Sequence, residues 1–449
     1  MNDVADAPHY ADHVRTLCHR ADVALARSHY DHLVISSGYP QYRLLDDQTY
    51  PYIPHPFFAS WVPMDQSPGS WLVYTPGQQP ELIIYQPQDY WHAPATVPNP
   101  SVCACYKIHL VQTPEHAFAL LPKPTERCAI IGQADSRSGQ YQPNNPSLVM
   151  RYLEYYRAYK TLYEQYILRQ AQNAAVRGHR VAAKAFYAGK SSFEIYMAYC
   201  TAVGQEPSRF PYTPIIAMQS SAAILHYTQF PHLQNTKHTN LLIDAGASVH
   251  GYAADISRSY AIDPTSTFAA LITAVENVQH TLCKAIQPGY SYIQLQTDAA
   301  LALMHVLKDA GVLKVSAETA LATGIAQVFF PHGIGHLIGI QVHDVGGHAR
   351  NHEGTVLPPP NTYPSLRLTR TLEPSMVVTV EPGLYFIDIL LQHARQSKYA
   401  GSIDWSCVAS FQPYGGIRIE DTLMCGDKGP ENLTRQAFAS YDANISPSG

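Results

Sequence analysis

The sequence lacks the features that mark membrane, secreted and disulfide-stabilised proteins. Its 449 residues contain no run of about 18 apolar residues that could span a bilayer, and the first residues show no apolar segment typical of a secretory signal. The eight cysteines are scattered without a CxxC pair, which excludes a disulfide framework and predicts free thiols in a reducing compartment. We therefore expect a soluble cytoplasmic protein without a membrane partner.

Charged side chains are also scarce. They make up 14% of the chain, below the typical value of about 25%. The 30 Lys and Arg residues against 35 Asp and Glu residues give a net charge of −5, and no basic block could follow a phosphate backbone, which argues against a nucleic-acid partner. A hydrophobic content of 46% is ordinary for a folded chain, and the length suggests two domains.

The chain has two parts that differ in the pattern of their apolar residues. A helical pattern over 8–28 precedes short apolar runs separated by Pro-rich loops, which predicts a small mixed α/β domain. The short runs are 33–38, 71–74, 81–85 and 128–132. A long helical pattern follows over 147–188, and later segments are extended over 213–262, helical within 265–312 and strand-like at 330–345, 376–386 and 416–425. We predict an α/β (α+β) chain with an N-terminal domain over 1–155 and a C-terminal domain over 156–449.

The first motif with chemical content is LLIDAGASVHGYAADISRSY, in which Asp244 and Asp255 lie in two β-leaning runs. If these runs form an antiparallel hairpin with its turn centred between Val249 and His250, the two carboxylates face each other. Facing like charges destabilise a hairpin and raise one pKa, so a buried pair needs a compensating cation. For this motif alone, two solvated aspartates beside a turn are the alternative.

The second motif, FFPHGIGHLIGIQVHDVGG, contains His332, His336 and His343. Its glycine density predicts irregular backbone that closely approaches another group rather than a regular helix. The HExxH signature of a zinc-protease helix is missing. For this motif alone, hydrogen-bonded histidines in a tight loop are the alternative.

Two further motifs place carboxylates at the ends of β-branched apolar runs: VVTVEPGLYF with Glu381, and YGGIRIEDTLMC with Glu420 and Asp421. Each could singly be an edge-strand charge. Together, four acids and one histidine in predicted core strands are costly to bury unless metal ions neutralise them. Two divalent cations would balance four carboxylates. Oxygen-rich ligation with one imidazole favours Mn²⁺, with Co²⁺ or a similar ion as the alternative, and predicts hydrolysis by an ionised water that bridges the ions.

In this order, DAGASVHGYAADISRSY, HGIGHLIGIQVHDVGG, VEPGLYF and GGIRIEDT resemble the metallopeptidases of the creatinase/aminopeptidase, or pita-bread, fold. Within that fold, the AILHYT and SLRLTR segments are similar to bacterial Xaa-Pro dipeptidases (prolidases), some of which also act as organophosphorus acid anhydrolases. The motifs span 213–425. The resemblance implies a C-terminal pita-bread catalytic domain with two Mn²⁺ per subunit, an N-terminal domain used in dimerisation, and a homodimer.

The resemblance also implies roles for individual residues. The implied metal ligands are Asp244, Asp255, His336, Glu381 and Glu420, with Asp255 and Glu420 bridging the ions. The implied catalytic residues are His226, His332, His343, Glu381 and Arg418. The residues expected around the substrate are Tyr212, Leu225, His226, Tyr292, Val342, His343, Leu366, Arg367 and Arg418. Whether a histidine or Glu381 carries the proton to the leaving group is left open.

The implied substrate is a dipeptide with C-terminal proline. A prolyl imide has no N–H and a fixed ring, so a dedicated pocket is needed. Arg367 or Arg418 would face the carboxylate, while acids near the metals face the amine.

Three alternatives stay open at the level of the sequence. An aminopeptidase P would act on longer peptides with the same metals, and a pita-bread binding protein would have lost catalysis. The Asp46–Asp47 pair could reach the active site of a neighbouring subunit, although a solvated loop is the simpler interpretation.

Overall fold

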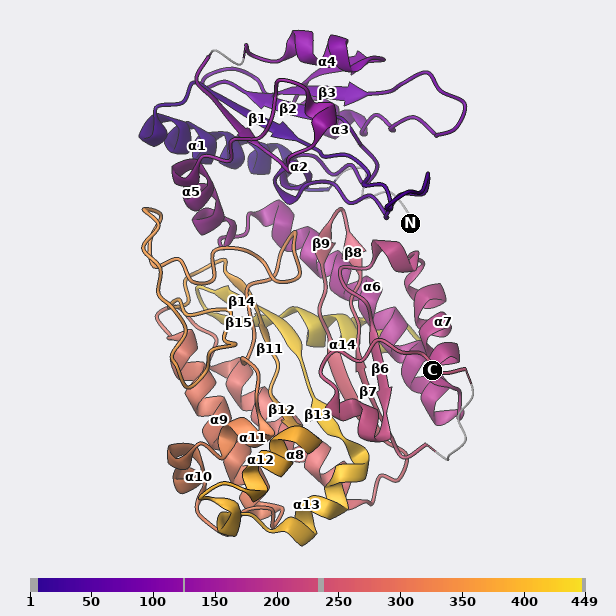
Figure 1. Cartoon of the computed structure of the whole chain (residues 1–449), viewed down its shortest axis with the longest axis vertical. Coiled ribbons are helices and arrows are strands. Elements are labelled where there is room, and N and C mark those ends of the chain that lie inside the picture. Colours follow the sequence, from indigo (N-terminus) through magenta and orange to yellow (C-terminus); the bar gives the residue numbers. More distant parts are fainter. Residues whose placement is uncertain (1–6, 124–125, 233–237, 446–449) are drawn as a thin grey trace.

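A mixed five-stranded sheet forms the N-terminal part of the chain (Figure 1). In this computed structural model, which describes residues 7–123, 126–232 and 238–445, the strand order is β4-β3-β2-β1-β5. The pairs β1–β2 and β2–β3 are antiparallel, whereas β1–β5 and β3–β4 are parallel. The strands are β1 (His32–Ser36), β2 (Trp71–Tyr74), β3 (Glu81–Tyr85), β4 (Lys107–Val111) and β5 (Cys128–Ile131). The helices here are α1 (Tyr10–Ser28), α2 (Pro56–Trp61), α3 (Pro100–Cys103) and α4 (Pro114–Leu120).

Both faces of β1, β2, β3 and β5 are buried, whereas the edge strand β4 is partly exposed. Along β1, Leu33 and Ile35 belong to one hydrophobic cluster and Val34, between them, belongs to another, because successive side chains of a strand point to opposite faces. Helix α1 covers the first face through residues such as Leu25, and α4 covers the second through Ala117. Burial on both faces explains why these strands are continuous apolar runs. The predicted small α/β domain is confirmed.

The helical pattern over 147–188 folds as two helices, α5 (Ser147–Arg157) and α6 (Leu162–Tyr187). The break has a local cause. The Thr161 hydroxyl accepts a hydrogen bond from the Glu164 N–H at 3.3 Å, while the Glu164 carboxylate accepts one from the Thr161 N–H at 2.8 Å. This capping box begins a new helix at Leu162. The predicted division between residues 155 and 156 falls inside α5 and stays a prediction.

Short antiparallel sheets build the C-terminal part, in the orders β10-β7-β6, β11-β14-β15, β12-β13 and β8-β9. Its strands are β6 (Ile215–Met218), β7 (Asn240–Asp244), β8 (Ser248–Val249), β9 (Tyr252–Ala253), β10 (Ser257–Ala261), β11 (Val377–Val380), β12 (Gly383–Tyr385), β13 (Gly416–Arg418), β14 (Asp421–Gly426) and β15 (Gly429–Asn432). Its helices are α7 (Ser192–Val203), α8 (Thr267–Lys284), α9 (Tyr292–Asp309), α10 (Ala317–Thr323), α11 (Ala326–Phe329), α12 (Asp388–Arg395), α13 (Trp405–Phe411) and α14 (Leu433–Ile445). In Figure 1, α6 and α7 lie on one side of these strands and α8 to α11 on the other. The mixture of helices and sheets confirms the predicted α/β class.

The predicted register of the aspartate hairpin is wrong by two residues. Asp244 pairs with Ser257, and Asp255 lies in the irregular segment between β9 and β10. The cause is turn chemistry. His250 (φ 48°) and Gly251 (φ 83°) both adopt the left-handed region, as a two-residue type I′ turn requires, and this turn lies one position later than predicted.

The strand predicted within 330–345 does not form. All of these residues are described, and they run as irregular backbone with a single bridge from Leu337 to Val378. Glycine explains the difference, because a Cβ added at Gly335 would lie 2.2 Å from the carbonyl oxygen of Thr379. The segment therefore approaches β11 more closely than a residue with a side chain could.

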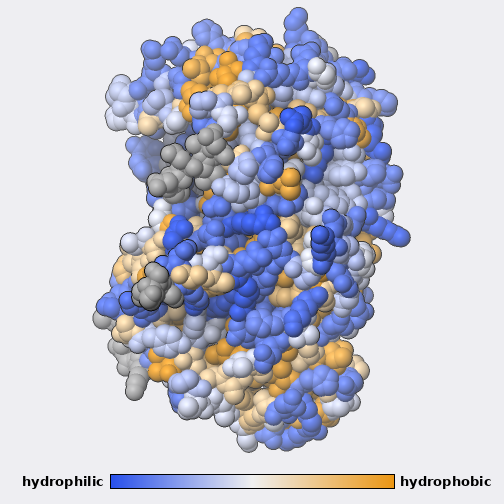
Figure 2. Space-filling view, turned by 180° about the vertical axis from the view of Figure 1, so that it is seen from behind, coloured by the Kyte–Doolittle hydropathy of each residue, from blue (hydrophilic) through white to orange (hydrophobic). Residues whose placement is uncertain are grey.

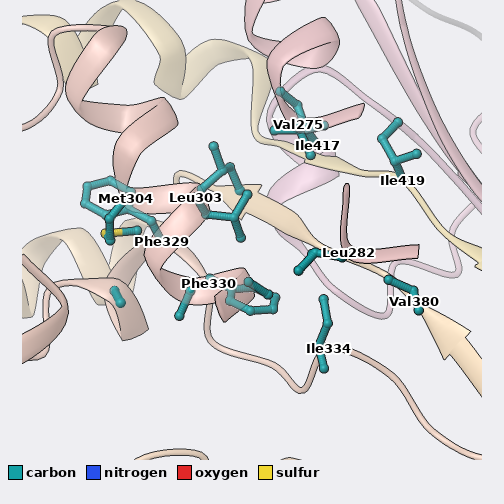
Figure 3. Packing of buried hydrophobic residues seen from close by; sticks show 14 of the residues in the cluster. Val275, Leu282, Leu303, Met304, Phe329, Phe330, Ile334, Val380, Ile417 and Ile419 are labelled. Atoms are coloured by element: carbon teal, nitrogen blue, oxygen red, sulfur yellow. The ribbon is translucent and has the colours of Figure 1, made fainter. Parts of the chain in front are cut away.

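The largest hydrophobic cluster supports the segments that carry the candidate site. Val380 directly precedes Glu381, and Ile419 directly precedes Glu420. Both apolar side chains are buried in one cluster with Ile334 (Figure 3). Because protein interiors are close-packed, the acidic residues attached to these segments are held in fixed positions.

The surface is mostly hydrophilic on the face shown in Figure 2, with smaller hydrophobic patches. Leu44 and Leu45 stand out in the loop after β1, because their side chains are 90% and 98% exposed. Among the described residues, no helix has the length and apolar character needed to cross a membrane.

Gly178 marks the close contact between α6 and α7. An added Cβ would lie 2.5 Å from Tyr199 Cε2 and 2.7 Å from Val203 Cγ2. Replacing glycine by alanine in a helix normally stabilises it by about 1 kcal/mol. Here we expect Gly178→Ala to destabilise the protein by about 1–3 kcal/mol through overpacking. Thermal unfolding followed by circular dichroism measures the effect as a lower Tm.

Gly401→Ala is the matched control, because its added Cβ meets nothing within 4 Å. Its Tm should equal that of the unmodified protein. A Tm for Gly178→Ala at or above that of the control would contradict the predicted clash.

Candidate metal centre and substrate cavity

The five predicted metal ligands line one cavity of about 470 Å³, which we call the metal cavity. Asp244 ends β7, Asp255 precedes β10, Glu381 follows β11, and Glu420 lies between β13 and β14. His336 comes from the irregular segment before β11. Each acid therefore lies at the end of a strand, and the tertiary fold brings the five side chains together.

Asp255, His336 and Glu420 form the tightest group, with one ligand atom of each within 4.8 Å of the others. His336 Nδ1 donates to the Leu337 carbonyl oxygen at 2.9 Å, which leaves the lone pair of Nε2 free. That Nε2 lies 3.4 Å from Asp255 Oδ2 and 3.7 Å from Glu381 Oε1. The arrangement fits a cation held between an imidazole nitrogen and carboxylate oxygens.

Glu420 gives an independent indication of a cation. Its Oε2 accepts a hydrogen bond from Ser257 Oγ at 2.8 Å, whereas its Oε1 is buried and has no donor among the described residues. A buried carboxylate oxygen without a partner is costly, and a divalent cation would satisfy it. A ligand set of carboxylate oxygens with one imidazole nitrogen suits such an ion, whereas a closed structural zinc site is typically built from Cys and His. The residues present fit divalent metal.

Tyr212 joins the two aspartates. Its hydroxyl lies 2.8 Å from Asp244 Oδ1 and 2.6 Å from Asp255 Oδ1. One hydroxyl carries one proton and can donate to one carboxylate only, so the second hydrogen bond requires a proton on the other carboxyl group. The two acids thus meet through Tyr212, although they are not partners across the strands.

Burial and mutual repulsion perturb these carboxyl groups. Burial raises the pKa of Asp255 well above its usual value, and Asp244 raises it further. Burial also raises the pKa of Glu381, with Glu420 as the next contribution, and burial together with Asp255 raises the pKa of Glu420. Without cations, the centre therefore retains protons at pH values where an isolated carboxyl group is ionised.

Arg418 is a buried cation at this centre, only 5% exposed. It donates from Nη2 to Asp244 Oδ2 at 2.7 Å, from Nε to Ser257 Oγ at 3.0 Å and from Nη1 to Tyr385 Oη at 2.8 Å. Three of the five N–H groups of a guanidinium are thus committed to the protein. Arg418 offsets the negative charge of Asp244, and only a small part of the Arg418 side chain faces the metal cavity.

Two of the predicted catalytic histidines are neutral at pH 7. Burial lowers the pKa of His332 to about 3, with a further contribution from Arg418, and burial with His336 lowers the pKa of His343 to about 3. His332 Nδ1 donates to the Gly333 carbonyl oxygen at 2.8 Å. Its Nε2, 2.9 Å from Tyr385 Oη, is therefore an acceptor.

Most of the residues expected around the substrate do line the metal cavity. Those that do so are Tyr212, Leu225, His226, Val342, His343, Arg367 and Arg418, and His332 of the predicted catalytic set lines it as well. Tyr292 and Leu366 are buried and do not line this cavity, so their role at the substrate stays a prediction. Tyr292 is fully buried and its hydroxyl donates to the Thr379 carbonyl oxygen at 2.5 Å, while Leu366, 1% exposed, packs against Gly333.

Two residues that sequence reasoning missed connect the centre. Ser257 bridges Glu420 and Arg418, and Tyr385 bridges Arg418 and His332. Their only sequence signal is position, since Ser257 follows Asp255 by two residues and Tyr385 ends the EPGLY motif. The chemistry of a serine or tyrosine does not single it out until its partners are known.

The remaining candidates are exposed. His226 and Arg367 border the metal cavity, and Arg367 forms no ion pair within the described part of the chain. Asp46 and Asp47 are exposed in the loop after β1, and neither lines this cavity.

Sequence comparisons agree with the geometry. Residues 8–155 match the family described as "Xaa-Pro dipeptidase, N-terminal domain", and residues 166–427 match "Metallopeptidase family M24". A Xaa-Pro dipeptidase of Xanthomonas axonopodis pv. citri is 53% identical over 431 residues, which cover 96% of this chain and 98% of that protein. One from Stenotrophomonas maltophilia is 51% identical over 431 residues, covering 96% and 97%.

Solved structures with the same fold are more distant in sequence. The aminopeptidase PepP of Pseudomonas aeruginosa has a TM-score of 0.70 at 19% identity, covering 96% of this chain and 99% of that chain. A zinc-substituted E. coli aminopeptidase P in complex with product has a TM-score of 0.70 at 20% identity, covering 96% and 98%. At this identity the likeness concerns the fold alone.

The raised carboxyl pKa values predict proton release when metal binds. Adding Mn²⁺ to chelated protein at pH 7 should release about one proton or more per subunit, because the cation ionises carboxyl groups that hold protons without it. His336 contributes none, since burial lowers its pKa to about 4. Isothermal titration calorimetry in two buffers of different ionisation enthalpy counts the protons.

Glu420→Gln removes one titrating group and should release fewer protons, whereas Glu318→Gln on exposed α10 should behave like the unmodified protein. Equal heats of metal binding in both buffers would rule out the raised pKa values.

The raised pKa values also predict how the free energy of unfolding depends on pH. The metal-free protein should become less stable as pH rises from the usual carboxyl range toward the raised values, because the folded state binds more protons there.

Proposed function

The chain belongs to metallopeptidase family M24, and from this premise we propose that it hydrolyses Xaa-Pro dipeptides with divalent metal ions. The observation that carries the proposal is one cavity lined both by a buried carboxylate and imidazole cluster and by Arg367, which forms no ion pair among the described residues. A cation site beside a guanidinium suits a substrate that has a scissile carbonyl close to a terminal carboxylate. The Xaa-Pro dipeptidases that are 51–54% identical to this chain support the same reaction.

The proposed metal content is two Mn²⁺ per subunit, with Co²⁺ or another divalent ion as the alternative. Asp244, Asp255, His336, Glu381 and Glu420 would hold these ions. When bound, such a pair activates a water molecule for attack and polarises the substrate carbonyl. Two divalent charges also offset the four carboxylates that the protein buries.

Arg367 is the proposed partner of the substrate carboxylate. Arg367 is exposed, lines the cavity and forms no ion pair among the described residues, so its guanidinium is suited to pair with a carboxylate of the substrate. Arg418 has three donors committed within the protein and is better suited to hold Asp244 in place. We therefore separate two roles that the sequence assigned to both arginines.

Glu381 is the proposed proton carrier. Its side chain lines the metal cavity, and in the ionised form that bound cations favour, its carboxylate can take a proton from the attacking water and pass it to the proline nitrogen. His332 and His343 are neutral at pH 7 and are poor proton donors there. The proposed part of His226 and His343 is to position the substrate and to stabilise the tetrahedral intermediate by hydrogen bonds. His332, whose ring nitrogens are bonded to Gly333 and Tyr385, is proposed to position the substrate through its place in the cavity wall.

Two alternatives are weaker. An aminopeptidase P has support at the level of the fold alone, from structures 19–20% identical to this chain. A binding protein without catalysis would not need the four buried acids and His336. Hydrolysis of organophosphorus triesters is proposed only as a side activity of the same centre.

The proposal also includes a cytoplasmic homodimer. The exposed Leu44 and Leu45, next to Asp46 and Asp47, support a protein contact for the loop after β1, because neighbouring exposed apolar side chains are typical of interaction sites.

The two arginines are separable by experiment. Arg367→Ala should raise KM for Ala-Pro by about 10-fold or more while metal content stays unchanged, because a charge-assisted hydrogen bond contributes about 1.5–3 kcal/mol. Arg418→Ala should lower metal content as well, since it leaves Asp244 and Ser257 without their partner. Steady-state kinetics and elemental analysis of the same preparations measure both. Arg367→Ala with unchanged KM would remove the carboxylate role.

Hydrolysis of Ala-Pro and Ala-Pro-Ala tests the reaction itself. The purified protein is chelated, reloaded with Mn²⁺ and assayed by product chromatography. We expect cleavage of Ala-Pro alone, restored by the metal. Cleavage of Ala-Pro-Ala as well would move the assignment to aminopeptidase P, and a protein that binds metal but cuts neither peptide would overturn the proposal.

A further inference from the structure

A buried ion cluster lies directly after His343 in the chain. The side chain of Asp344 is 2% exposed and pairs with two cations, Arg157 at the end of α5 and Lys160 between α5 and α6, whose side chains are 8% and 1% exposed. Lys160 Nζ donates to Asp344 Oδ2 at 2.8 Å, and Arg157 Nη2 donates to Asp344 Oδ1. Lys160 Nζ also donates to the Arg157 carbonyl oxygen. We call Arg157, Lys160 and Asp344 the ion cluster.

The two cations keep Asp344 ionised. Burial raises the pKa of Asp344, but Arg157 and Lys160 lower it by more, so it lies below its usual value. The backbone N–H of Val345 donates to the same carboxylate at 3.0 Å. A carboxylate that accepts charge-assisted hydrogen bonds from two cations and a third from the backbone has little freedom to move.

The backbone before Asp344 is held together with its carboxylate. The Asp344 N–H donates to the Leu337 carbonyl oxygen at 2.9 Å, so the chain folds back on itself between these residues. Gly339 lies against the carboxylate, because an added Cβ there would be 2.3 Å from Asp344 Oδ2 and 2.8 Å from Lys160 Nζ. The segment is therefore fixed although it forms no strand.

Arg157 connects this segment to the N-terminal part of the chain. Helix α5, which ends at Arg157, lies where the two parts meet (Figure 1). The guanidinium carbon of Arg157 is 5.1 Å from the centre of the Phe57 ring in α2, within the range of a cation–π contact. Arg157 Nη2 also donates to Gln341 Oε1 at 3.1 Å. The N-terminal part thus contacts the segment that carries His343.

The side chain of His343 has no such anchor of its own. It lines the metal cavity and forms no hydrogen bond within the described part of the chain. Its ring meets that of His336 edge to face, with centroids 4.5 Å apart. A side chain without hydrogen bonds is placed mainly by its backbone, and the backbone of His343 is held through Asp344.

We propose that Asp344 is a positioning residue for His343: held by Arg157 and Lys160, it fixes the backbone that directs the His343 imidazole into the metal cavity. The inference rests on the proposed dipeptidase activity, in which His343 positions the substrate and stabilises the tetrahedral intermediate. It adds the residues that control His343, and it gives α5 a part in the reaction although Arg157 does not line the metal cavity.

A double-mutant cycle between Lys160 and His343 tests the proposal. Lys160→Met removes one cation and leaves the balanced pair of Arg157 and Asp344. In the metal-loaded protein it should lower kcat for Ala-Pro by about 10-fold or more, since a misplacement of about 1 Å can cost about 100-fold in rate. In protein that carries His343→Ala, assayed at raised protein concentration, the same change should alter kcat by less than about 2-fold, because a residue that acts only through the imidazole has no effect without it.

Lys190→Met is the matched control. Lys190 Nζ also donates to a carboxylate at 2.8 Å, that of Glu194, but the two side chains are 53% and 48% exposed. This variant should leave kcat unchanged. If Lys160→Met does not fold, Arg157→Lys takes its place, because an ammonium group does not reproduce the planar guanidinium that contacts both Gln341 and Asp344.

Hydrogen exchange followed by mass spectrometry gives a second readout that does not depend on activity. Peptides that cover residues 337–345 of the metal-loaded protein should exchange about 10-fold faster or more in Lys160→Met than in Lys190→Met, because local opening becomes easier when the ion cluster is weakened. Peptides of α9 should exchange equally in both variants.

The outcomes separate this inference from the proposed function. An equal loss of kcat with and without His343 would show a purely structural role, and unchanged kcat and exchange in Lys160→Met would show no role; either overturns the positioning of His343 alone, since Ala-Pro is still cleaved. Failure of the unmodified protein to cleave Ala-Pro, with metal bound, overturns the proposed function and this inference together.

Discussion

The repulsion between four buried carboxyl groups is the constraint on which the rest of the structure depends. Asp244, Asp255, Glu381 and Glu420 share one cavity, and burial of like charges is unfavourable unless opposite charge is nearby. The protein supplies part of that charge through Arg418, which is itself buried and held by three hydrogen bonds. The rest must come from outside the chain, which is why the same cluster that would destabilise a metal-free protein is suited to hold divalent ions.

The fold holds the four acids close together by packing the backbone segments that carry them. The acids follow or precede short strands whose apolar residues, such as Val380 and Ile419, are packed in the largest hydrophobic cluster (Figure 3). His336 lies on glycine-rich backbone that approaches β11 within a distance no side chain would allow. A rigid frame of this kind keeps the ligand atoms close to their final positions before a metal arrives, so little conformational entropy is lost on binding.

The charged groups around the metal cavity also favour one orientation of a bound substrate. Arg367 borders the metal cavity and forms no ion pair among the described residues, whereas Arg418 is held by Asp244, Ser257 and Tyr385. A substrate whose terminal carboxylate pairs with Arg367 therefore has one favourable orientation. Arg367 is thus suited to bind the substrate, whereas Arg418 stabilises the metal centre through its hydrogen bonds within the protein.

The sequence by itself determined the class of the fold, the first helix and four of the five strands of the N-terminal part, and the identities of the acids and histidines, because apolar periodicity and unusual polar residues in apolar runs are local properties. It did not determine the register of β7 and β10, the irregular backbone over 330–345, or the burial of Tyr292 and Leu366. Those depend on turn geometry and on contacts between residues far apart in the chain. Ser257 and Tyr385 became recognisable as part of the centre only through such contacts, as did the division of labour between Arg367 and Arg418. Tertiary structure decided these points because hydrogen-bond partners and burial are properties of the folded chain.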